Sequence, residues 1–349
     1  MGSGPLNDYG RALFATEITA NSSGTSEDQL SDESGFLGST EIPWWIRPGA
    51  KFRGMFYKTK LENNDNSVNR FIPMQANLNV ALLLDKKAEN IIVASFDYAP
   101  TPSRFKSSTE RPPANWLSKE HYYRWQIQKG LLLYVGLMDK PFGLRHPDHT
   151  AFDRGFDGFG LSQNDQSHGL TIQYSTEAVD LYLNTFFGNM SQDAELRQKG
   201  FSLMSEYSTS KNVVVGFSYL QSKNDYLDMT RTSVHTRVGF AKGKSIMAEL
   251  GLRKDVPLLI ADPTTTGAFT YVQALIALER GYNLLTTYQI YKDDLTNSGV
   301  TRNKLGLGAL MFPWKKTEFR TEIINDRTVA EQNTTDDTWS LQAQVHLSW

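Results

Sequence analysis

The chain has 349 residues, a formal net charge of -2 and a mean hydropathy of -0.43, with 40% hydrophobic and 12% aromatic residues. The near-neutral charge gives no basic field for nucleic acid, and the lack of cysteine excludes a disulfide framework and thiolate metal sites. No stretch approaches the roughly 18 apolar residues that a spanning helix needs, which excludes a helical membrane protein.

Residues 1–48 form the first segment, which is rich in glycine, serine and acidic residues and has no persistent periodicity. Its opening, MGSGPLNDY, has no apolar core, so we expect a mature chain from which a signal peptide is absent. The composition predicts a mostly irregular acidic extension. Two other roles stay open, namely that the segment threads into the rest of the protein or that it binds a partner.

From residue 49 onward, apolar and polar residues alternate with a period of two in one segment after another, for example in 200–207, 233–240 and 246–253. This period predicts strands and not helices. Together with glycine and proline breakers it predicts about sixteen strands, an even number. We place them at 49–60, 68–84, 89–99, 119–128, 131–138, 167–175, 178–188, 200–209, 212–222, 231–242, 244–254, 267–279, 281–292, 301–312, 315–325 and 337–349.

The last eleven residues, WSLQAQVHLSW, alternate without a break and carry a tryptophan at each end. A terminal strand that stops on an aromatic residue is typical of a barrel crossing an outer membrane, with its apolar face toward lipid and its polar face toward the lumen. A strand of a soluble sandwich would show the same alternation.

The expected connections alternate between short and long. The short ones are 129–130, 209–212, 241–244 and 313–314, and the long ones are 100–118, 139–166, 189–199, 223–230, 255–266, 293–300 and 326–336. This order predicts an all-β, up-and-down antiparallel transmembrane barrel over 49–349, with short periplasmic turns, long external loops and both ends on the periplasmic side. Because lipid offers no hydrogen-bond partner, the sheet must close, and sixteen strands leave an aqueous channel.

The longest connection, 139–166, is the third external loop, and it carries four phenylalanines among its charges. A loop in bulk water has little use for them, so we expect it to fold into the lumen and form a constriction. A structured surface loop or a subunit contact are the alternatives. The charged and histidine side chains predicted to line this constriction are Lys140, Arg145, His146, Asp148, His149, Asp153, Arg154 and Asp157.

Charged residues also fall on the polar faces of the expected strands. A lysine or arginine facing mid-bilayer lipid costs about 2–4 kcal/mol, so these faces should meet water. Separated clusters of each sign would create a transverse field that favours charged or dipolar solutes, with no ion preference implied. Alternatively, pairs such as Glu249 with Arg237 hold a plugged barrel together. The residues are Lys51, Arg53, Arg124, Arg237, Arg253, Arg302, Lys304, Arg320, Asp97, Asp180, Glu206, Glu249, Glu318 and Glu322.

Tryptophans at the ends of expected strands are predicted to anchor the barrel at the membrane interfaces. These are Trp44, Trp45, Trp314, Trp339 and Trp349. For Trp44 and Trp45, a small apolar cluster under the first strand is the other interpretation.

These features together resemble the outer-membrane porins of Gram-negative bacteria over residues 49–349. The run GLMDKPFGLRHPDHT at 136–150 is similar to the strand-to-loop passage of the phosphate- and polyphosphate-selective branch, in which a Gly-x-x-x-x-Pro-Phe-Gly pattern recurs. The resemblance implies a trimeric, water-filled channel in contact with outer-membrane lipid and lipopolysaccharide. It also implies that the third loop forms the eyelet. Selective members carry a dense ladder of arginines and lysines, which this chain interrupts with acids.

Other functions have less support in the sequence. We find no GxSxG, HExxH or P-loop pattern. A metal or hydrolytic cluster would need His146, Asp148, His149 and His168, with Ser162 as a nucleophile, but a chance grouping explains these residues better. We therefore predict a porin that passes small hydrophilic or charged solutes, with no cofactor, metal or enzymatic activity. The alternative is a barrel scaffold or conduit whose lumen or 1–48 tail binds a periplasmic partner protein.

Overall fold

A computed structural model describes residues 43–61, 67–98, 116–144, 151–152, 165–258, 263–279, 281–296, 300–314, 317–329 and 335–348. Most of the predicted 1–48 extension lies outside this range, and the first strand begins at Ile46. Within the described residues, no helix has the length and apolar character needed to cross a membrane.

The described residues form sixteen antiparallel strands, which confirms the predicted all-β fold class and strand number. One turn of 3-10 helix, Ala194–Leu196, lies between two of them. The strands are β1 Ile46–Leu61, β2 Ser67–Leu83, β3 Asn90–Tyr98, β4 Trp116–Gln128, β5 Leu131–Met138, β6 Ser167–Ser175, β7 Val179–Phe186, β8 Lys199–Ser210, β9 Val213–Lys223, β10 Leu227–Ala241, β11 Lys244–Pro257, β12 Thr265–Glu279, β13 Tyr282–Lys292, β14 Thr301–Trp314, β15 Thr317–Val329 and β16 Thr335–Ser348.

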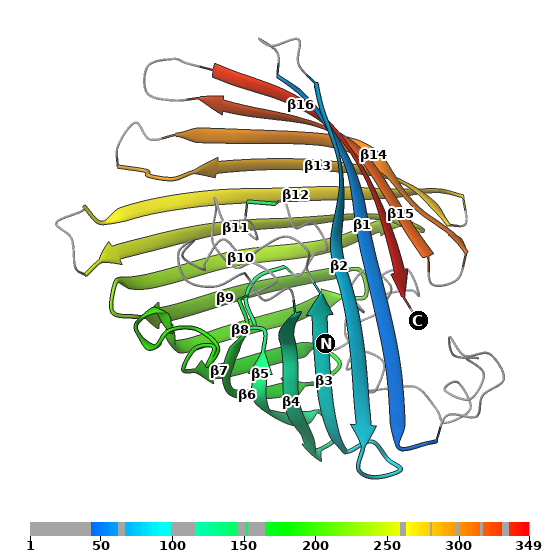
Figure 1. Cartoon of the computed structure of the whole chain (residues 1–349), viewed down its shortest axis with the longest axis vertical. Coiled ribbons are helices and arrows are strands. Elements are labelled where there is room, and N and C mark those ends of the chain that lie inside the picture. The colour runs from blue at the N-terminus through cyan, green and yellow to red at the C-terminus, as the bar shows by residue number, and fades with distance from the viewer. Residues whose placement is uncertain are drawn as a thin grey trace.

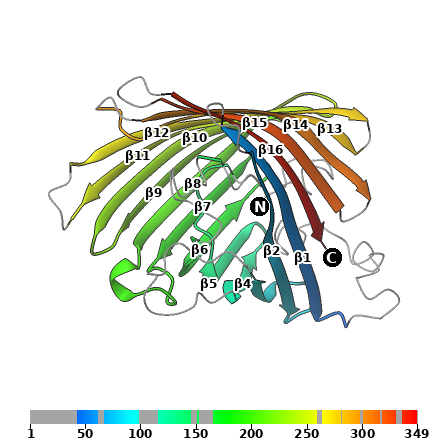
Figure 2. The same cartoon turned by 45° about the horizontal axis from the view of Figure 1, so that its top comes forward.

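The sheet closes on itself because the first strand pairs with the last (Figure 1). In this seam Lys51 of β1 lies opposite Ser348 of β16, and Arg53 lies opposite His346. Every other strand pairs with its two sequence neighbours, so the ring has no unpaired edge, as Figure 2 shows from a second direction. The start of β1 and the end of β16 therefore lie at the same end of the barrel.

The short turns form where glycine supplies the backbone angle. Gly130 and Gly243 have φ of +80° and +71°, in the left-handed region that two-residue hairpin turns use. A Cβ atom at Gly130 would collide with the carbonyl oxygen of Ser175. The turns predicted at 129–130 and 241–244 are confirmed for this reason.

The turn predicted at Pro313 and Trp314 is wrong, because both residues belong to β14 and the next strand begins at Thr317. Proline lacks the N–H that a regular ladder uses. Here it lies at the end of the strand, inside a register shift between Met311 and Trp314, where the pairing is already interrupted.

The predicted long loop at 223–230 is also wrong, since only three residues separate β9 from β10. The side-chain oxygen of Asn224 accepts hydrogen bonds from the backbone N–H groups of Tyr226 (2.9 Å) and Leu227 (2.8 Å). This local pattern closes a tight turn, and strand pairing therefore continues through the residues expected to be loop.

The two faces of the wall have the opposite character from a soluble protein. Leu250, Leu307 and Ile323 are between 51% and 56% exposed on the outside, whereas Glu249 and Glu322 are at most 3% exposed on the inside. A soluble monomer rarely presents such a continuous apolar surface. Apolar outward faces and polar inward faces are the arrangement of a barrel that spans a membrane.

The tryptophans predicted as anchors lie near strand ends with large exposed fractions. Trp44 and Trp45 precede β1, Trp314 ends β14 at the same end of the barrel, and Trp339 lies near the opposite end, in β16. Trp349 lies outside the described residues.

Candidate functional site

The candidate site is the lumen, which the inward faces of all sixteen strands enclose. The strand register places the charged residues predicted for the polar faces on the same faces as the buried polar side chains. Many of them form ion pairs across neighbouring strands.

One ion-pair cluster joins β8 to β10. Glu206 accepts hydrogen bonds from Nε2 of His235 (3.0 Å) and Nη2 of Arg237 (2.5 Å). Arg237 thus contacts Glu206 across β9, and not Glu249 as in the example pair of the plugged-barrel alternative.

Two further clusters line β10, β11, β14 and β15. Asp255 is shared by Arg231 and Arg253, the latter at 3.8 Å. Asp326 is shared by Arg302 (3.1 Å) and Lys304 (3.7 Å). These four cations and two carboxylates form the basic arc of the wall.

The opposite arc carries an acidic residue. Asp97 of β3 accepts from Gln75 Nε2 (2.8 Å) and from Asn77, and it lies 3.4 Å from Lys119 Nζ. In the ring order β3 and β11 are eight strands apart, so Asp97 faces the basic arc across the lumen.

The connection 139–166 is described at 139–144, 151–152 and 165–166, and in these parts its backbone bonds to inward-facing side chains. Gly143 N–H donates to Ser218 Oγ of β9 (2.9 Å). Leu144 N–H donates to Glu249 Oε2 of β11 (2.8 Å), and Phe152 N–H donates to Gln289 Oε1 of β13 (3.0 Å).

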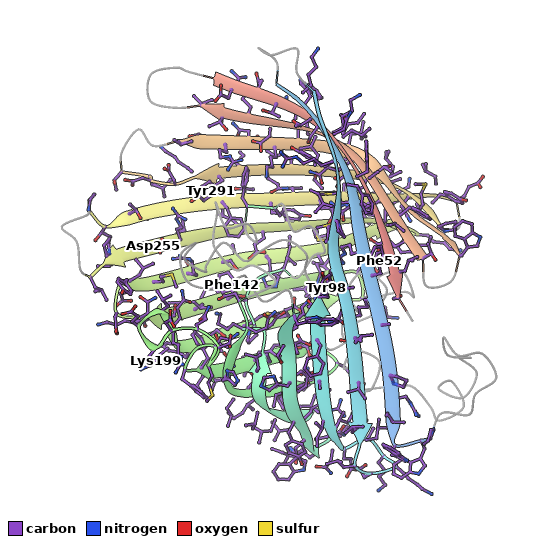
Figure 3. All side chains as sticks on the ribbon, viewed as in Figure 1. Phe52, Tyr98, Phe142, Lys199, Asp255 and Tyr291 are labelled. Carbon is purple, nitrogen blue, oxygen red and sulfur yellow. The ribbon has the colours of Figure 1, made fainter. Side chains whose placement is uncertain are left out.

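Two phenylalanines of this connection are buried against the wall. Phe142 packs with Phe186 and Leu220, and Figure 3 shows it inside the ring of strands. Phe152 is 3% exposed and packs with Tyr291 in a cluster that also contains Ala151, Phe269 and Tyr271. The other two phenylalanines of the connection lie outside the described residues.

Cations cover the ring of Phe152. Lys304 Nζ lies 4.3 Å from its centroid and the Arg302 guanidinium lies 5.1 Å away, while the ring of Tyr291 is 5.6 Å away, centroid to centroid. A cation over an aromatic face is attracted by the ring quadrupole. Phe152 is therefore held by packing and by the basic arc together.

Gly143 permits the close approach to β11. Its φ is +59°, and a Cβ atom here would collide with the Glu249 carboxylate. Glycine is thus required at this position both by the backbone conformation and by the space available.

The base of the connection is held by Lys140, whose Nζ lies 2.6 Å from Asp165 Oδ2 and 5.1 Å from the Phe186 ring centroid. Burial raises the pKa of the Asp165 carboxyl, and the neighbouring Lys140 ammonium opposes this effect. Gln166 also donates to Asp139, at 2.8 Å.

Several predicted residues are not brought to this region. Arg124 donates to the carbonyl oxygen of Ala88, beside the short turn between β2 and β3. His168 faces outward, with its ring 5.2 Å from that of His121. Among the described residues no group of three or more His, Asp or Glu is placed to hold a metal ion. The predicted constriction residues Arg145, His146, Asp148, His149, Asp153, Arg154 and Asp157 lie outside the described residues.

No family model and no curated protein matches the sequence. Solved structures do match over most of the chain. The outer membrane channel DcaP of Acinetobacter baumannii has a TM-score of 0.60 at 11% identity, covering 87% of this chain and 97% of its own. The anion-selective porin of Comamonas acidovorans has a TM-score of 0.62 at 8% identity, covering 87% and 99%. The outer membrane protein OmpT of Vibrio cholerae, in trimer form, has a TM-score of 0.63 at 9% identity, covering 87% and 100%.

This chain has the porin fold. At these identities the likeness concerns the fold alone. The roles of the residues in the lumen therefore follow from their own contacts in this chain. Sequence reasoning missed Ser218, Gln289 and Asp326, which contact the connection or the basic arc. In the sequence, these three residues are marked only by lying at the alternate strand positions that face inward. Many other polar residues share this feature.

Proposed function

We propose that this protein is an outer-membrane porin through which small hydrophilic or charged solutes diffuse, and that the connection 139–166 folds inward and narrows its lumen. The observation that carries the proposal is the set of backbone hydrogen bonds from this connection to Ser218, Glu249 and Gln289. These acceptors belong to β9, β11 and β13, whereas the connection joins β5 to β6, and this separation supports an inward path.

The charges support passage of polar solutes. Arg253, Arg302 and Lys304 outnumber the carboxylates on the basic arc, whereas Asp97 on the opposite arc is paired with Lys119. An uneven distribution of charge around the lumen creates a transverse field, which favours solutes that carry charge or a dipole over apolar ones of the same size. In this proposal, size is selected by the connection and polarity by the walls.

The proposed channel works as a homotrimer in contact with outer-membrane lipid. Support for the trimer comes from the trimer form of the similar Vibrio cholerae structure. Short strands also cluster on one side, since β3, β5, β6 and β7 have 8 or 9 residues around a β4 of 13, whereas β1 and β2 have 16 and 17. Short strands span a bilayer less fully, which favours contact with another copy on that side.

Liposome swelling tests this function. Vesicles that contain the purified protein are placed in isosmotic solutions of sugars of increasing size. We expect rapid swelling with small sugars and a sharp size limit. A triple variant, Ser218→Ala/Glu249→Ala/Gln289→Ala, removes the three acceptors and should admit larger sugars. Absence of swelling with the smallest sugar, from a folded and inserted protein, contradicts the proposal.

A further inference from the structure

Two histidines lie in one row of the ladder at the end of the barrel that carries the long connections. His121 of β4 pairs with Leu137 of β5, and Leu137 pairs in turn with His168 of β6. These three strands are neighbours in the ring (Figure 1). His168 is the second residue of β6, and Leu137 is the second-last residue of β5. The row therefore lies at the rim of the wall, beside the connections.

The two imidazole rings lean toward each other over Leu137, on the outside of the barrel. Tyr123 and Val135, two residues away on their strands, are 36% and 46% exposed, which places this row on the outward face. Leu137 itself is only 1% exposed. The strands that carry the histidines are two strand spacings apart, about 9.5 Å. The ring centroids are nevertheless 5.2 Å apart, so the rings converge above the leucine side chain.

The Nδ1 atom of each ring has a partner in the protein. Nδ1 of His121 lies 2.8 Å from Ser118 Oγ. Nδ1 of His168 lies 3.3 Å from the carbonyl oxygen of Gly188 and 3.2 Å from the backbone nitrogen of Met190. The Nδ1–H tautomer donates to Gly188 and leaves the Nε2 lone pair for a ligand, whereas the Nε2–H tautomer accepts from Met190 instead. Histidines that bind a metal usually hold their second nitrogen in this way, on a protein oxygen.

The separation of the rings matches two ligands of one tetrahedral metal ion. With a metal–nitrogen bond of about 2.1 Å and about 1.1 Å from nitrogen to ring centre, each centroid would lie about 3.2 Å from the ion. Two centroids 5.2 Å apart then subtend about 110° at the ion, which is the tetrahedral angle. The ring planes meet at 62°, and coordination leaves this angle free because a ring can turn about its metal–nitrogen bond.

Imidazole nitrogen suits zinc, copper and nickel ions, and tetrahedral geometry favours zinc among them. We propose that His121 and His168 form a Zn²⁺ site on the outer rim of the barrel, with water in the two remaining positions. This site goes beyond the channel function and departs from the sequence analysis, which predicts no metal. A bound ion selects the Nδ1–H tautomer of His168 and so favours its bond to Gly188. The ion thereby joins the rim of β4 to the connection that follows β7.

Equilibrium dialysis of the full chain in detergent against Zn²⁺, with the bound metal counted by atomic emission, tests the site. The test variants are His121→Phe and His168→Phe, which remove a ligand and keep an aromatic ring over Leu137. His146→Ala/His149→Ala is the matched control, because it removes the other two histidines that are close together in the chain. We expect one bound ion per chain in the wild type and in the control. Either phenylalanine variant should bind zinc at least about tenfold more weakly.

Zinc should also raise the thermal midpoint of the wild type and leave that of the phenylalanine variants unchanged, since a ligand of the folded state stabilises it. Equal zinc binding by the wild type and both phenylalanine variants would overturn the inference. Loss of zinc from His146→Ala/His149→Ala would also overturn it, because the ion would then belong to the connection 139–166. A folded wild-type protein that binds no zinc would do the same. Conductance of the phenylalanine variants should stay normal because both rings lie outside the lumen, so the zinc site and the channel proposal fail separately.

Discussion

The backbone N–H of Leu144 donates a 2.8 Å hydrogen bond to Oε2 of Glu249, although 105 residues separate them in the chain. This bond joins the connection after β5 to the inner face of β11, six strands further along the ring. Because Glu249 is 2% exposed, its carboxylate is largely removed from water and depends on such donors.

Removal of this acceptor should loosen the connection. We expect Glu249→Ala to raise single-channel conductance and current noise, since a hydrogen bond to a charged group contributes about 1.5–3 kcal/mol. Glu249→Gln keeps a carbonyl oxygen in place and should stay close to wild type in both readouts. Equal conductance of the alanine variant and the wild type would mean that the bond does not position the connection in the lumen.

Gly143→Ala should disturb the same contact from the other side. The new Cβ atom collides with the Glu249 carboxylate, and a left-handed backbone costs an alanine about 1–2 kcal/mol. Thermal unfolding should show a lower midpoint for this variant. Gly239→Ala is the matched control, because its nearest neighbour atom would be 3.9 Å away.

A double-mutant cycle separates the collision from the backbone strain. Glu249→Ala removes the colliding carboxylate, so Gly143→Ala should cost less stability in that background than in the wild type. Simple additivity of the two changes would refute the contact.

Phe152→Ala should widen the passage. It removes a buried ring from between Tyr291 and Lys304, which leaves a cavity and ends a cation–π contact. Liposome swelling should then proceed with larger sugars than the wild type admits. Phe217→Ala, which changes an outward ring that is 41% exposed, should leave the size limit unchanged. An identical size limit in the Phe152 variant would place the constriction elsewhere.

Selectivity should depend on pH through Asp165. Burial raises the pKa of this carboxyl, so it takes up a proton at a higher pH than an ordinary aspartate as the pH falls. The negative charge 2.6 Å from the Lys140 ammonium is then removed, and the reversal potential in a salt gradient should shift toward anions. Asp165→Asn should show the shifted value at neutral pH and should lack this part of the pH dependence. Asp225→Asn, in the exposed turn before β10, is the control and should behave like the wild type. If the reversal potential of Asp165→Asn had the same pH dependence as that of the wild type, the Asp165 carboxyl would not be its source.

The orientation of the wall can be tested with one pair of variants. Leu250→Arg turns a charge toward lipid, which costs about 2–4 kcal/mol at mid-bilayer, whereas Gln344→Arg adds a charge on the inward face. Folding into vesicles, followed by tryptophan fluorescence and urea titration, should be weakened in the first variant and little changed in the second. The reverse order would contradict the assignment of the faces.

Much of the fold was predictable because strands have an apolar–polar pattern with a period of two and glycine at the turns between them. All sixteen strands were placed within a few residues, including β11 and β13, whose polar faces carry Glu249 and Gln289. The turn expected at Pro313 is absent because a proline is tolerated within a strand where the pairing register is already shifted. The tight turn at Asn224 depends on side-chain hydrogen bonds that the polar–apolar pattern does not contain.

The contacts within the lumen were less predictable from the sequence than the strands. Alternation gives the face of a residue but not its partner. The example pair of the plugged-barrel alternative, Glu249 with Arg237, therefore differs from the observed pair, in which Glu206 holds Arg237 from two strands away. The acceptors Ser218 and Gln289 depend on the path of a connection that has no periodicity. Such contacts follow from tertiary packing alone.

The most direct test is the single-channel current of the purified protein in a planar lipid bilayer. A water-filled lumen predicts stepwise, nearly ohmic conductance that grows in proportion to salt concentration, with larger steps in Glu249→Ala. A protein that inserts as a folded barrel and yet gives no conductance steps at any salt concentration would contradict the account.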